Sequence, residues 1–414
     1  MFKGGSEGCV TAKNEEAKKV RIRMSLTEIF YNFCIASSNY RTVFLQSVGM
    51  GAEGIGLIAS LSSVAGIVAA PVCGILSDRL RSVRQCFMVC LGLSALLMLA
   101  LPFIPAGQTG GMIAIAVLLV LSSLFTGPAN NMMENWLVCT ENRWPSVSYG
   151  SMRVWASGAF AVMGLLYVPL LARIPVSSVY GFYFIFAVPA LLLALRAPSE
   201  GEAVRRERTR LRDMPFRQLL RARLVLYIVF VMLFTVPSNW KVTYFVYVLN
   251  RCGYDSSTFG LYMFISAGCE IPALLLSRRV IRRFGPLKPM LVCYGMLVAE
   301  SLLYVSAGSL LPVILGQVLK GLSSGMVYAC QIRYIYRLAP KGLETTAHTL
   351  MNTAGSAVVI LSSALGGVLL VRLGTDLFFR IVAALEIAAV LLFLMCLLIY
   401  RLRKKRPEGS GRKA

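Results

Sequence analysis

Long apolar runs alternate with short polar segments along almost the whole chain. Each run has roughly 20 residues, the length at which an α-helix crosses a ~30 Å hydrocarbon core. The runs are continuous rather than alternating residue by residue, which predicts membrane helices and not the strands of an outer-membrane barrel. Twelve spans are predicted, at 26–47, 54–76, 86–104, 111–138, 153–172, 178–196, 224–248, 257–276, 288–307, 310–330, 350–371 and 376–400.

The composition agrees with an all-α integral membrane protein. Of the 414 residues, 57% are hydrophobic and only 15% are charged, and the mean hydropathy is +0.69. A soluble domain does not need so many apolar runs to fill its core.

The net charge of +23 is distributed unevenly between the loops. Lys and Arg gather in the N-terminal tail, after spans two and eight, in the middle loop and in the C-terminal tail. The alternate loops carry little beyond Arg173, Arg251 and Arg372. This asymmetry predicts that both termini are cytoplasmic and that the protein lies in the cell membrane. Anionic lipid headgroups explain the basic loops, so no nucleic acid partner is expected.

The chain divides into two similar halves. We expect a cytoplasmic tail at 1–23, six-helix halves at 24–196 and 223–400, a basic linker at 197–222 and a basic tail at 401–414. The linker could form a short amphipathic helix on the inner leaflet or a solvated loop. "GILSDRLRSVR" after span two and "LLLSRRVIRRFG" after span eight lie about two hundred residues apart, which indicates an internal repeat.

The first of these segments resembles the signature loop of the major facilitator superfamily, G-x-L-[SA]-D-[RK]-x-G-x-[RK]-[RK]. Arg81 and Val83 depart from the pattern, and the matching residues are Gly74, Leu76, Ser77, Asp78 and Arg79. The resemblance implies a fold of twelve helices in two halves, with Asp78 helping to lock the halves together at the cytoplasmic side. Gly74 and Arg79 would belong to the same gating motif. Alternatively, Asp78 and Arg79 only solvate a short turn.

Charged residues inside the spans point to a polar site. An ionisable group at bilayer depth costs on the order of 3 kcal/mol, so it usually faces the bundle interior with a partner. In span four, Asn130, Asn131 and Glu134 recur at helical spacing and share one face. Arg153, in the first turns of span five, could lie level with Glu134 and neutralise it. The pair could also be a purely structural tie.

The resemblance narrows here to the oligosaccharide and nucleoside proton symporter branch. That branch has a glutamate in span four, an arginine about eighteen residues later and an aromatic seven residues after the arginine. Here these are Glu134, Arg153 and Phe160. A glutamate in span eight maps onto Glu270. The resemblance implies that these residues, with Asn130 and Asn131, bind the solute, although Glu270 could instead be a polar contact near the outer surface.

The branch's arginine in span nine and its His–Glu pair in span ten are missing. Span nine offers Glu300, and span ten offers Lys320. We therefore expect Glu270, Glu300 and Lys320 to carry proton coupling, with Glu300 and Lys320 as a pair. Lys241 and Arg41 are expected to snorkel to the outer interface.

Other charged or reactive residues receive no functional role from the sequence. Glu386 is unassigned, and His348 is expected at the surface. The eleven cysteines are scattered singly, which favours neither a disulfide framework nor a metal site. There is no phosphate-binding loop or nucleophile motif, so we expect neither an enzyme nor a cofactor.

The sequence therefore predicts a monomeric secondary transporter whose partners are the lipid bilayer, a proton and a small polar solute such as a sugar or nucleoside. An exporter of amphiphilic drugs or metabolites is the alternative, although "RVWASGAF" lacks the Gly-x-x-x-Gly-Pro-x-x-Gly pattern typical of antiporters. A membrane sensor that transports nothing is a third possibility, because a fold does not fix a function.

Overall fold

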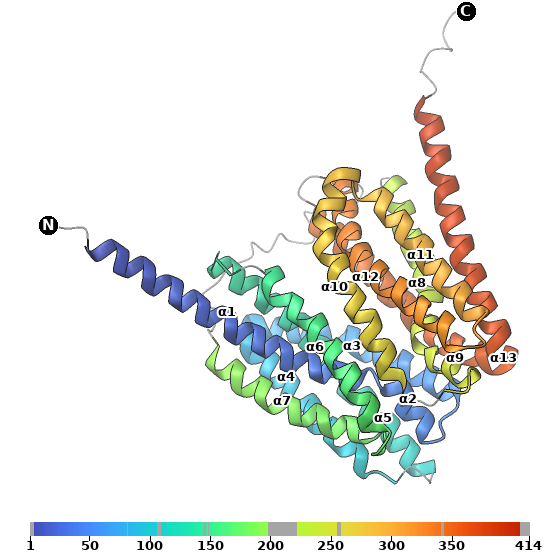
Figure 1. Cartoon of the computed structure of the whole chain (residues 1–414), viewed down its shortest axis with the longest axis horizontal. Helices are drawn as coiled ribbons and strands as arrows, with labels where there is room; N and C mark the ends of the chain where they lie inside the picture. Colours follow the sequence, from blue (N-terminus) through green and yellow to red (C-terminus); the bar gives the residue numbers. More distant parts are fainter. Residues whose placement is uncertain are drawn as a thin grey trace, which may run out of the picture.

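The computed structural model describes residues 4–80, 82–105, 109–144, 146–147, 149–197, 222–254, 258–340 and 343–405. Within these residues every regular element is helical (Figure 1). The helices are α1 Gly4–Ser38, α2 Arg41–Ser47, α3 Ala52–Leu80, α4 Val83–Ala100, the 3₁₀ helix η1 Leu101–Phe103, α5 Thr109–Arg143, α6 Tyr149–Leu171, α7 Ser178–Arg196, α8 Ala222–Thr243, α9 Phe245–Arg251, α10 Phe259–Phe284, α11 Leu287–Val305, α12 Leu310–Leu338 and α13 Glu344–Lys405.

The predicted all-α membrane architecture is confirmed. In the described part of the chain, ten helices are long and apolar enough to cross a membrane. The last of them, within α13, is interrupted at Gly374, whose backbone (φ 73, ψ 166) is not helical. The count of twelve spans and the cytoplasmic termini stay predictions.

Spans one and seven were predicted as single helices, and this is wrong. Helix α1 ends at Ser38 and is followed by the seven-residue α2, just as α8 ends at Thr243 and is followed by the seven-residue α9. Tyr40 and Tyr244 stand before the short helices with ψ near 0 (5 and 15), so the backbone turns there. The two breaks recur 204 residues apart, which supports the internal repeat.

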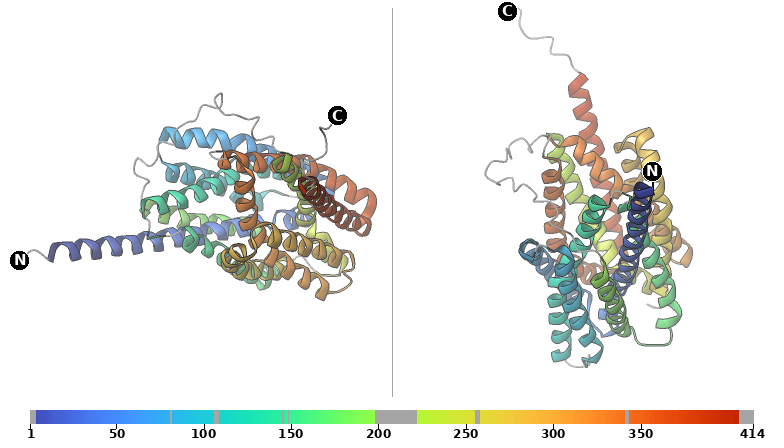
Figure 2. Two further views of the ribbon diagram at one scale, coloured as in Figure 1. Left: turned by 90° about the horizontal axis from the view of Figure 1, so that it is seen from above. Right: turned by 90° about the vertical axis from the view of Figure 1, so that its left-hand side faces the viewer.

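The chain before the linker and the chain after it form two bundles that meet along two helix pairs. Helix α3 packs on α13, and α6 packs on α10. We call the end of the molecule where α2 and α9 lie the α2/α9 end, and the opposite end, where α7 stops and α8 starts, the linker end. The bundles diverge toward the linker end, and α1 and α13 project beyond them there (Figures 1 and 2).

Glycines allow the bundles to approach closely at the α2/α9 end. A Cβ atom on Gly56 of α3 would lie 2.6 Å from the Tyr244 hydroxyl and 2.5 Å from the Ser363 carbonyl oxygen. A Cβ on Gly260 of α10 would lie 2.7 Å from the Tyr40 hydroxyl and even closer to the carbonyl oxygen of Gly164. Only glycine permits backbones to pack at these separations, so this end is closed by direct helix contact.

Arginines hold the linker end of α7. Arg23 donates a hydrogen bond to the carbonyl oxygen of Arg196 at 2.8 Å, and Arg84 donates to that of Ala197 at 2.8 Å. These carbonyls have no partner within their own helix, and a cation is favoured at a helix C-terminus. The predicted linker boundaries are close to the observed helix ends, but residues 198–221, and with them the predicted amphipathic helix or loop, lie outside the described residues.

Candidate functional site

Helices α5 and α6 bring together the ion pair that the spacing predicts. Arg153 Nε donates to Glu134 Oε1 at 2.9 Å. The two side chains are 38% and 33% exposed. A charged hydrogen bond that remains this accessible can exchange partners with a polar ligand, whereas a fully buried tie could not.

A second carboxylate, which sequence analysis missed, shares the same arginine. Glu28 lies on α1, and its Oε1 is 3.9 Å from Arg153 Nη1. The residue is only 2% exposed, and its Oε2 has no hydrogen-bond partner among the described residues. Three helices of the first bundle thus place two carboxylates and one guanidinium together. The sequence signal was a lone acidic residue within the apolar part of the first helix.

The other predicted ligands of the first bundle lie near this group. Helix α5 is unbroken from Thr109 to Arg143, so Asn130, Asn131 and Glu134 share a face as the spacing predicts. Both asparagines are exposed. Phe160 is half-buried and packs against an apolar cluster that draws residues from both bundles. Their contact with a solute stays a prediction.

The second bundle contributes groups from α10 and α12. Glu270 is half-buried and lies within electrostatic range of both Arg153 and Lys320. Tyr328, which is 59% exposed, lies within electrostatic range of Glu134 and Arg153. Sequence analysis missed Tyr328, because a tyrosine in an apolar span carries no distinctive pattern. The two bundles therefore offer polar groups to one shared region.

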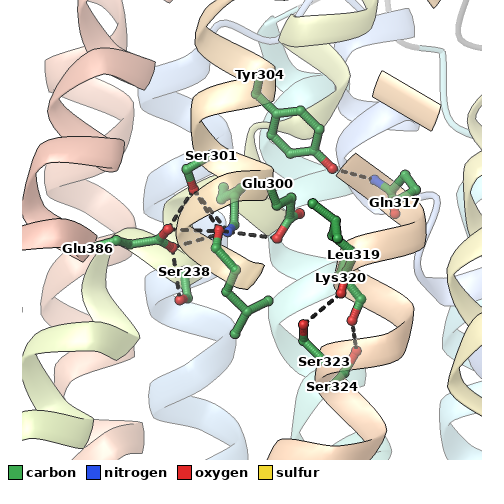
Figure 3. A network of polar contacts seen from close by, with 12 residues as sticks. Ser238, Glu300, Ser301, Tyr304, Gln317, Leu319, Lys320, Ser323, Ser324 and Glu386 are labelled. Atoms are coloured by element: carbon green, nitrogen blue, oxygen red, sulfur yellow. Dashed lines mark hydrogen bonds and ion pairs between the residues drawn. The ribbon is translucent and has the colours of Figure 1, made fainter. Parts of the chain in front are cut away.

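The prediction that Lys241 snorkels to the outer interface is wrong. Its Nζ lies 2.8 Å from Glu300 Oε2 and 3.1 Å from Glu386 Oε1, and its side chain is 4% exposed. Glu386, unassigned from the sequence, also accepts hydrogen bonds from Ser238 at 3.2 Å and Ser301 at 2.6 Å (Figure 3). Helices α8, α11 and α13 thus enclose a charged cluster inside the second bundle.

The predicted Glu300–Lys320 pair is replaced by the Glu300–Lys241 pair. Lys320 lies within electrostatic range of Glu300 on one side and Glu270 on the other. Next to this region, Gln317 donates to the hydroxyl of Tyr304 at 2.9 Å (Figure 3). Lys320 is thus electrostatically coupled both to the enclosed cluster, through Glu300, and to Glu270.

The residues of the gating motif lie on a helix rather than in a loop. Helix α3 continues to Leu80, and so carries Gly74 and Arg79, of which Arg79 is exposed. The side chain of Asp78 lies outside the described residues. At the other end, Arg41 begins α2 and is half-buried. His348 is half-buried and its ring contacts Tyr336, so it is less accessible than expected.

Three of the cysteines are not scattered as the sequence suggests. The sulfur atoms of Cys73, Cys86 and Cys90 lie within 4.8 Å of one another and are buried. The Cys86 thiol lies 3.4 Å from the carbonyl oxygen of Cys73, to which it can donate. Protonated cysteines behave as small apolar side chains in a core, and we assign these thiols to packing.

A cavity of about 390 Å³ does not include Glu134, Arg153 or Glu270 in its lining. It is lined by Met163, Leu166, Pro169, Leu170, Arg173, Phe182 and Phe186 of α6, α7 and their connection. This lining is mostly apolar, which does not suit a polar solute. The region between Glu134, Arg153, Glu270 and Tyr328 has the convergent polar groups expected of a binding site.

The comparisons with known proteins match most of the chain. The model of the MFS_1 like family matches residues 22–381. The chain is 26% identical over 362 residues to a maltose permease of Geobacillus stearothermophilus, covering 86% of this chain and 88% of that protein. It is 24% identical over 305 residues to the uncharacterized transporter YwbF of Bacillus subtilis (strain 168), covering 73% and 74%.

Solved structures share the fold. The crystal structure of the nucleoside transporter NupG matches with a TM-score of 0.74 at 13% identity, covering 91% of this chain and 98% of that one. The crystal structure of a D-xylose-proton symporter matches with a TM-score of 0.65 at 13% identity, covering 90% and 96%.

Proposed function

The chain belongs to the MFS_1 like family of transporters, and from that premise we propose that it is a proton symporter that imports a sugar, nucleoside or similar polar solute by alternating access. It is a multi-pass membrane protein and a transporter rather than an enzyme. The half-exposed Glu134–Arg153 pair, facing Glu270 and Tyr328 of the other bundle, is the observation that carries the proposal.

The pair would bind the solute by exchanging partners with it. A sugar or nucleoside hydroxyl can donate to Glu134 and accept from Arg153, and charged hydrogen bonds of this kind are among the strongest available. Asn130 and Asn131 would add neutral hydrogen bonds, and Phe160 would offer a ring face. Because the binding groups come from both bundles, a bound solute favours bringing the bundles together.

We assign the structure to a state open toward the cytoplasm. The bundles are closed at the α2/α9 end by glycine contacts and diverge toward the linker end, and the Glu134 and Arg153 side chains are partly exposed (Figure 1). The basic residues of the flanking segments favour a cytoplasmic linker end. Gly74, Asp78 and Arg79 at the end of α3 would form the gate that closes this side in the opposite state.

Proton coupling would involve Glu270, Glu300 and Lys320. Glu300 is held by the Lys241 ammonium at 2.8 Å, which leaves Glu270 as the carboxylate nearer the solute site. A half-buried carboxylate between an arginine of one bundle and a lysine of the other can release its proton when these cations approach. Coupling would then follow the movement of the bundles.

The relatives support the class of solute. A maltose permease, a nucleoside transporter and a D-xylose-proton symporter are all carriers of polar, hydroxyl-rich molecules. Asparagines, a carboxylate and an arginine next to aromatic rings suit such molecules. The pattern does not distinguish a pyranose from a nucleoside.

Uptake into proteoliposomes tests the proposal. Purified protein is reconstituted, an inward proton gradient is imposed, and accumulation of labelled maltose, xylose, other sugars and nucleosides is measured with and without an uncoupler. We expect gradient-dependent uptake of at least one solute, lost in Glu134→Gln. If no sugar or nucleoside accumulates but dyes are expelled when the gradient is reversed, the protein is an exporter and the proposal is wrong.

A further inference from the structure

The ammonium group of Lys241, on α8, is surrounded by oxygen atoms from two other helices, α11 and α13. Besides Glu300 Oε2 at 2.8 Å and Glu386 Oε1 at 3.1 Å, Nζ lies 3.0 Å from Ser301 Oγ, 3.1 Å from the carbonyl oxygen of Leu297 and 3.5 Å from Glu386 Oε2. We call these oxygens the α11–α13 cage. Two carboxylates, a hydroxyl and a backbone carbonyl are hard oxygen donors, the donor set that proteins use for hard metal cations.

The number of oxygens exceeds what an ammonium group needs. A lysine has three N–H donors, whereas five oxygens of the cage lie within 3.5 Å of Nζ. An ion pair alone would require one carboxylate oxygen. The other two N–H groups of the ammonium would then need one acceptor each. Five oxygens around a group with three hydrogens resemble the coordination shell of a metal cation more closely than the acceptors of a hydrogen-bonded lysine.

The cage is also buried, and groups other than Lys241 orient one of its carboxylates. Glu300, Ser301 and Glu386 are each 0% exposed. Ser238 donates to Glu386 Oε1 at 3.2 Å and Ser301 donates to Glu386 Oε2 at 2.6 Å, so hydroxyl groups fix the orientation of this carboxylate without help from the lysine (Figure 3). Glu300 is held by its ion pair with Lys241 and lies beside the hydroxyl of Tyr304.

We propose that Lys241 is a built-in cation, whose ammonium, carried by α8, fills an alkali-cation site formed by oxygens of α11 and α13. A cation tethered to the chain needs no supply from solution and pays no translational entropy on binding. The ammonium thus supplies, without Na⁺ or K⁺, a positive charge between two carboxylates that would be costly to bury without one. Removing the ammonium opens the site to a free ion.

The proposal is independent of the solute and is tested through stability. Lys241→Ala leaves two enclosed carboxylates and room for an ion. We expect the midpoint of thermal unfolding of purified Lys241→Ala to rise saturably with NaCl or KCl by about 2 °C or more over its value in choline chloride at equal ionic strength. The unsubstituted protein should show no difference between these salts.

Two further variants keep the test decisive. Lys320→Ala removes another lysine of the second bundle, one that forms no ion pair with a described carboxylate, and should gain nothing specific from Na⁺ or K⁺. Lys241→Ala combined with Glu386→Gln lowers the charge of the cage and should be less dependent on the ion. It also provides a folded protein to measure if Lys241→Ala alone unfolds without salt.

Two results would overturn the proposal. In the first, NaCl, KCl and choline chloride stabilise Lys241→Ala and the double variant equally. In the second, acidification restores their stability while Na⁺ and K⁺ do not, which would mean that the cage accepts protons only. A failure of solute uptake would affect the proposed function and leave this test unchanged.

Discussion

Arg153 Nη1 lies 3.9 Å from Oε1 of Glu28, a carboxylate enclosed in α1. The same guanidinium donates to Glu134 at 2.9 Å, so its bond to Glu134 is the shorter of the two. One arginine shared by two carboxylates leaves an excess of negative charge in this group. A ligand that draws Arg153 toward itself must therefore change the environment of Glu28 as well.

Replacing Glu28 by glutamine should stabilise the protein. A carboxylate that is 2% exposed and 3.9 Å from its cation gains less from the pair than it loses by desolvation. We expect the midpoint of thermal unfolding of Glu28→Gln in detergent to be equal to or higher than that of the unsubstituted protein. Glu28→Ala, which leaves a cavity, should lower it. A clear decrease with glutamine would show that the charged form is net stabilising.

Replacing either member of the Glu134–Arg153 pair should impair solute binding. Removing one partner of a charged hydrogen bond costs about 1.5–3 kcal/mol, which corresponds to roughly a tenfold to hundredfold loss of affinity. Arg153→Lys should also fail, because a lysine cannot donate to both carboxylates in the fork geometry of a guanidinium. Binding is measured by calorimetry with a transported solute. Normal transport by both Glu134→Gln and Arg153→Lys would refute the assigned site.

Tyr328→Phe should show whether Tyr328 contacts the solute through its hydroxyl group or through its ring. The side chain is 59% exposed, so loss of its hydroxyl should leave the fold unchanged. A neutral hydrogen bond is worth about 0.5–1.5 kcal/mol, and we expect Kd to rise by roughly threefold to tenfold. Tyr328→Ala should weaken binding further if the ring also stacks on the solute. Equal affinity in all three proteins would exclude Tyr328 from the site.

Replacing two glycines of α6 by alanine should have different effects on transport. A Cβ on Gly164 would lie 2.7 Å from the carbonyl oxygen of Gly260 and 2.9 Å from the backbone nitrogen of Phe264, whereas a Cβ on Gly158 meets nothing within 4 Å. Gly164→Ala should therefore separate the bundles and reduce transport several-fold. Gly158→Ala should transport normally and gain up to about 1 kcal/mol from helix propensity. Initial rates of uptake and unfolding midpoints check both, and equal rates would contradict closure through Gly164.

The sequence was sufficient to predict an all-helical membrane protein and the Glu134–Arg153 ion pair. Continuous apolar runs predict helices because nothing else satisfies the backbone in lipid, and this left little freedom in fold class. Glu134 and Arg153 were paired because only a short connection separates antiparallel neighbours. Both inferences depend on local distances along the chain.

The same reasoning could not predict contacts between helices that are far apart in the sequence. Lys241 was placed at the membrane edge because residues 224–248 were read as one span, whereas the chain turns at Tyr244 and α11 and α13 cover the lysine. Glu28 was overlooked because it follows the charged N-terminal segment and its partner lies 125 residues away. Such pairs depend on which helices become neighbours, and no local pattern encodes this.

The contacts that close the α2/α9 end have a consequence for how the two halves of the chain recognise each other. Tyr40 lies over Gly260 and Tyr244 over Gly56, and both members of each contact are displaced by 204 residues from their counterparts. The same tyrosine–glycine contact thus occurs twice, with the two halves interchanged. A two-fold symmetric dimer produces this pattern, because residue i of one copy contacts residue j of the other, and residue j of the first contacts residue i of the second. The two halves of the single chain thus meet through contacts of the isologous kind. Fragments 1–197 and 222–414, expressed separately, should still recognise each other through them.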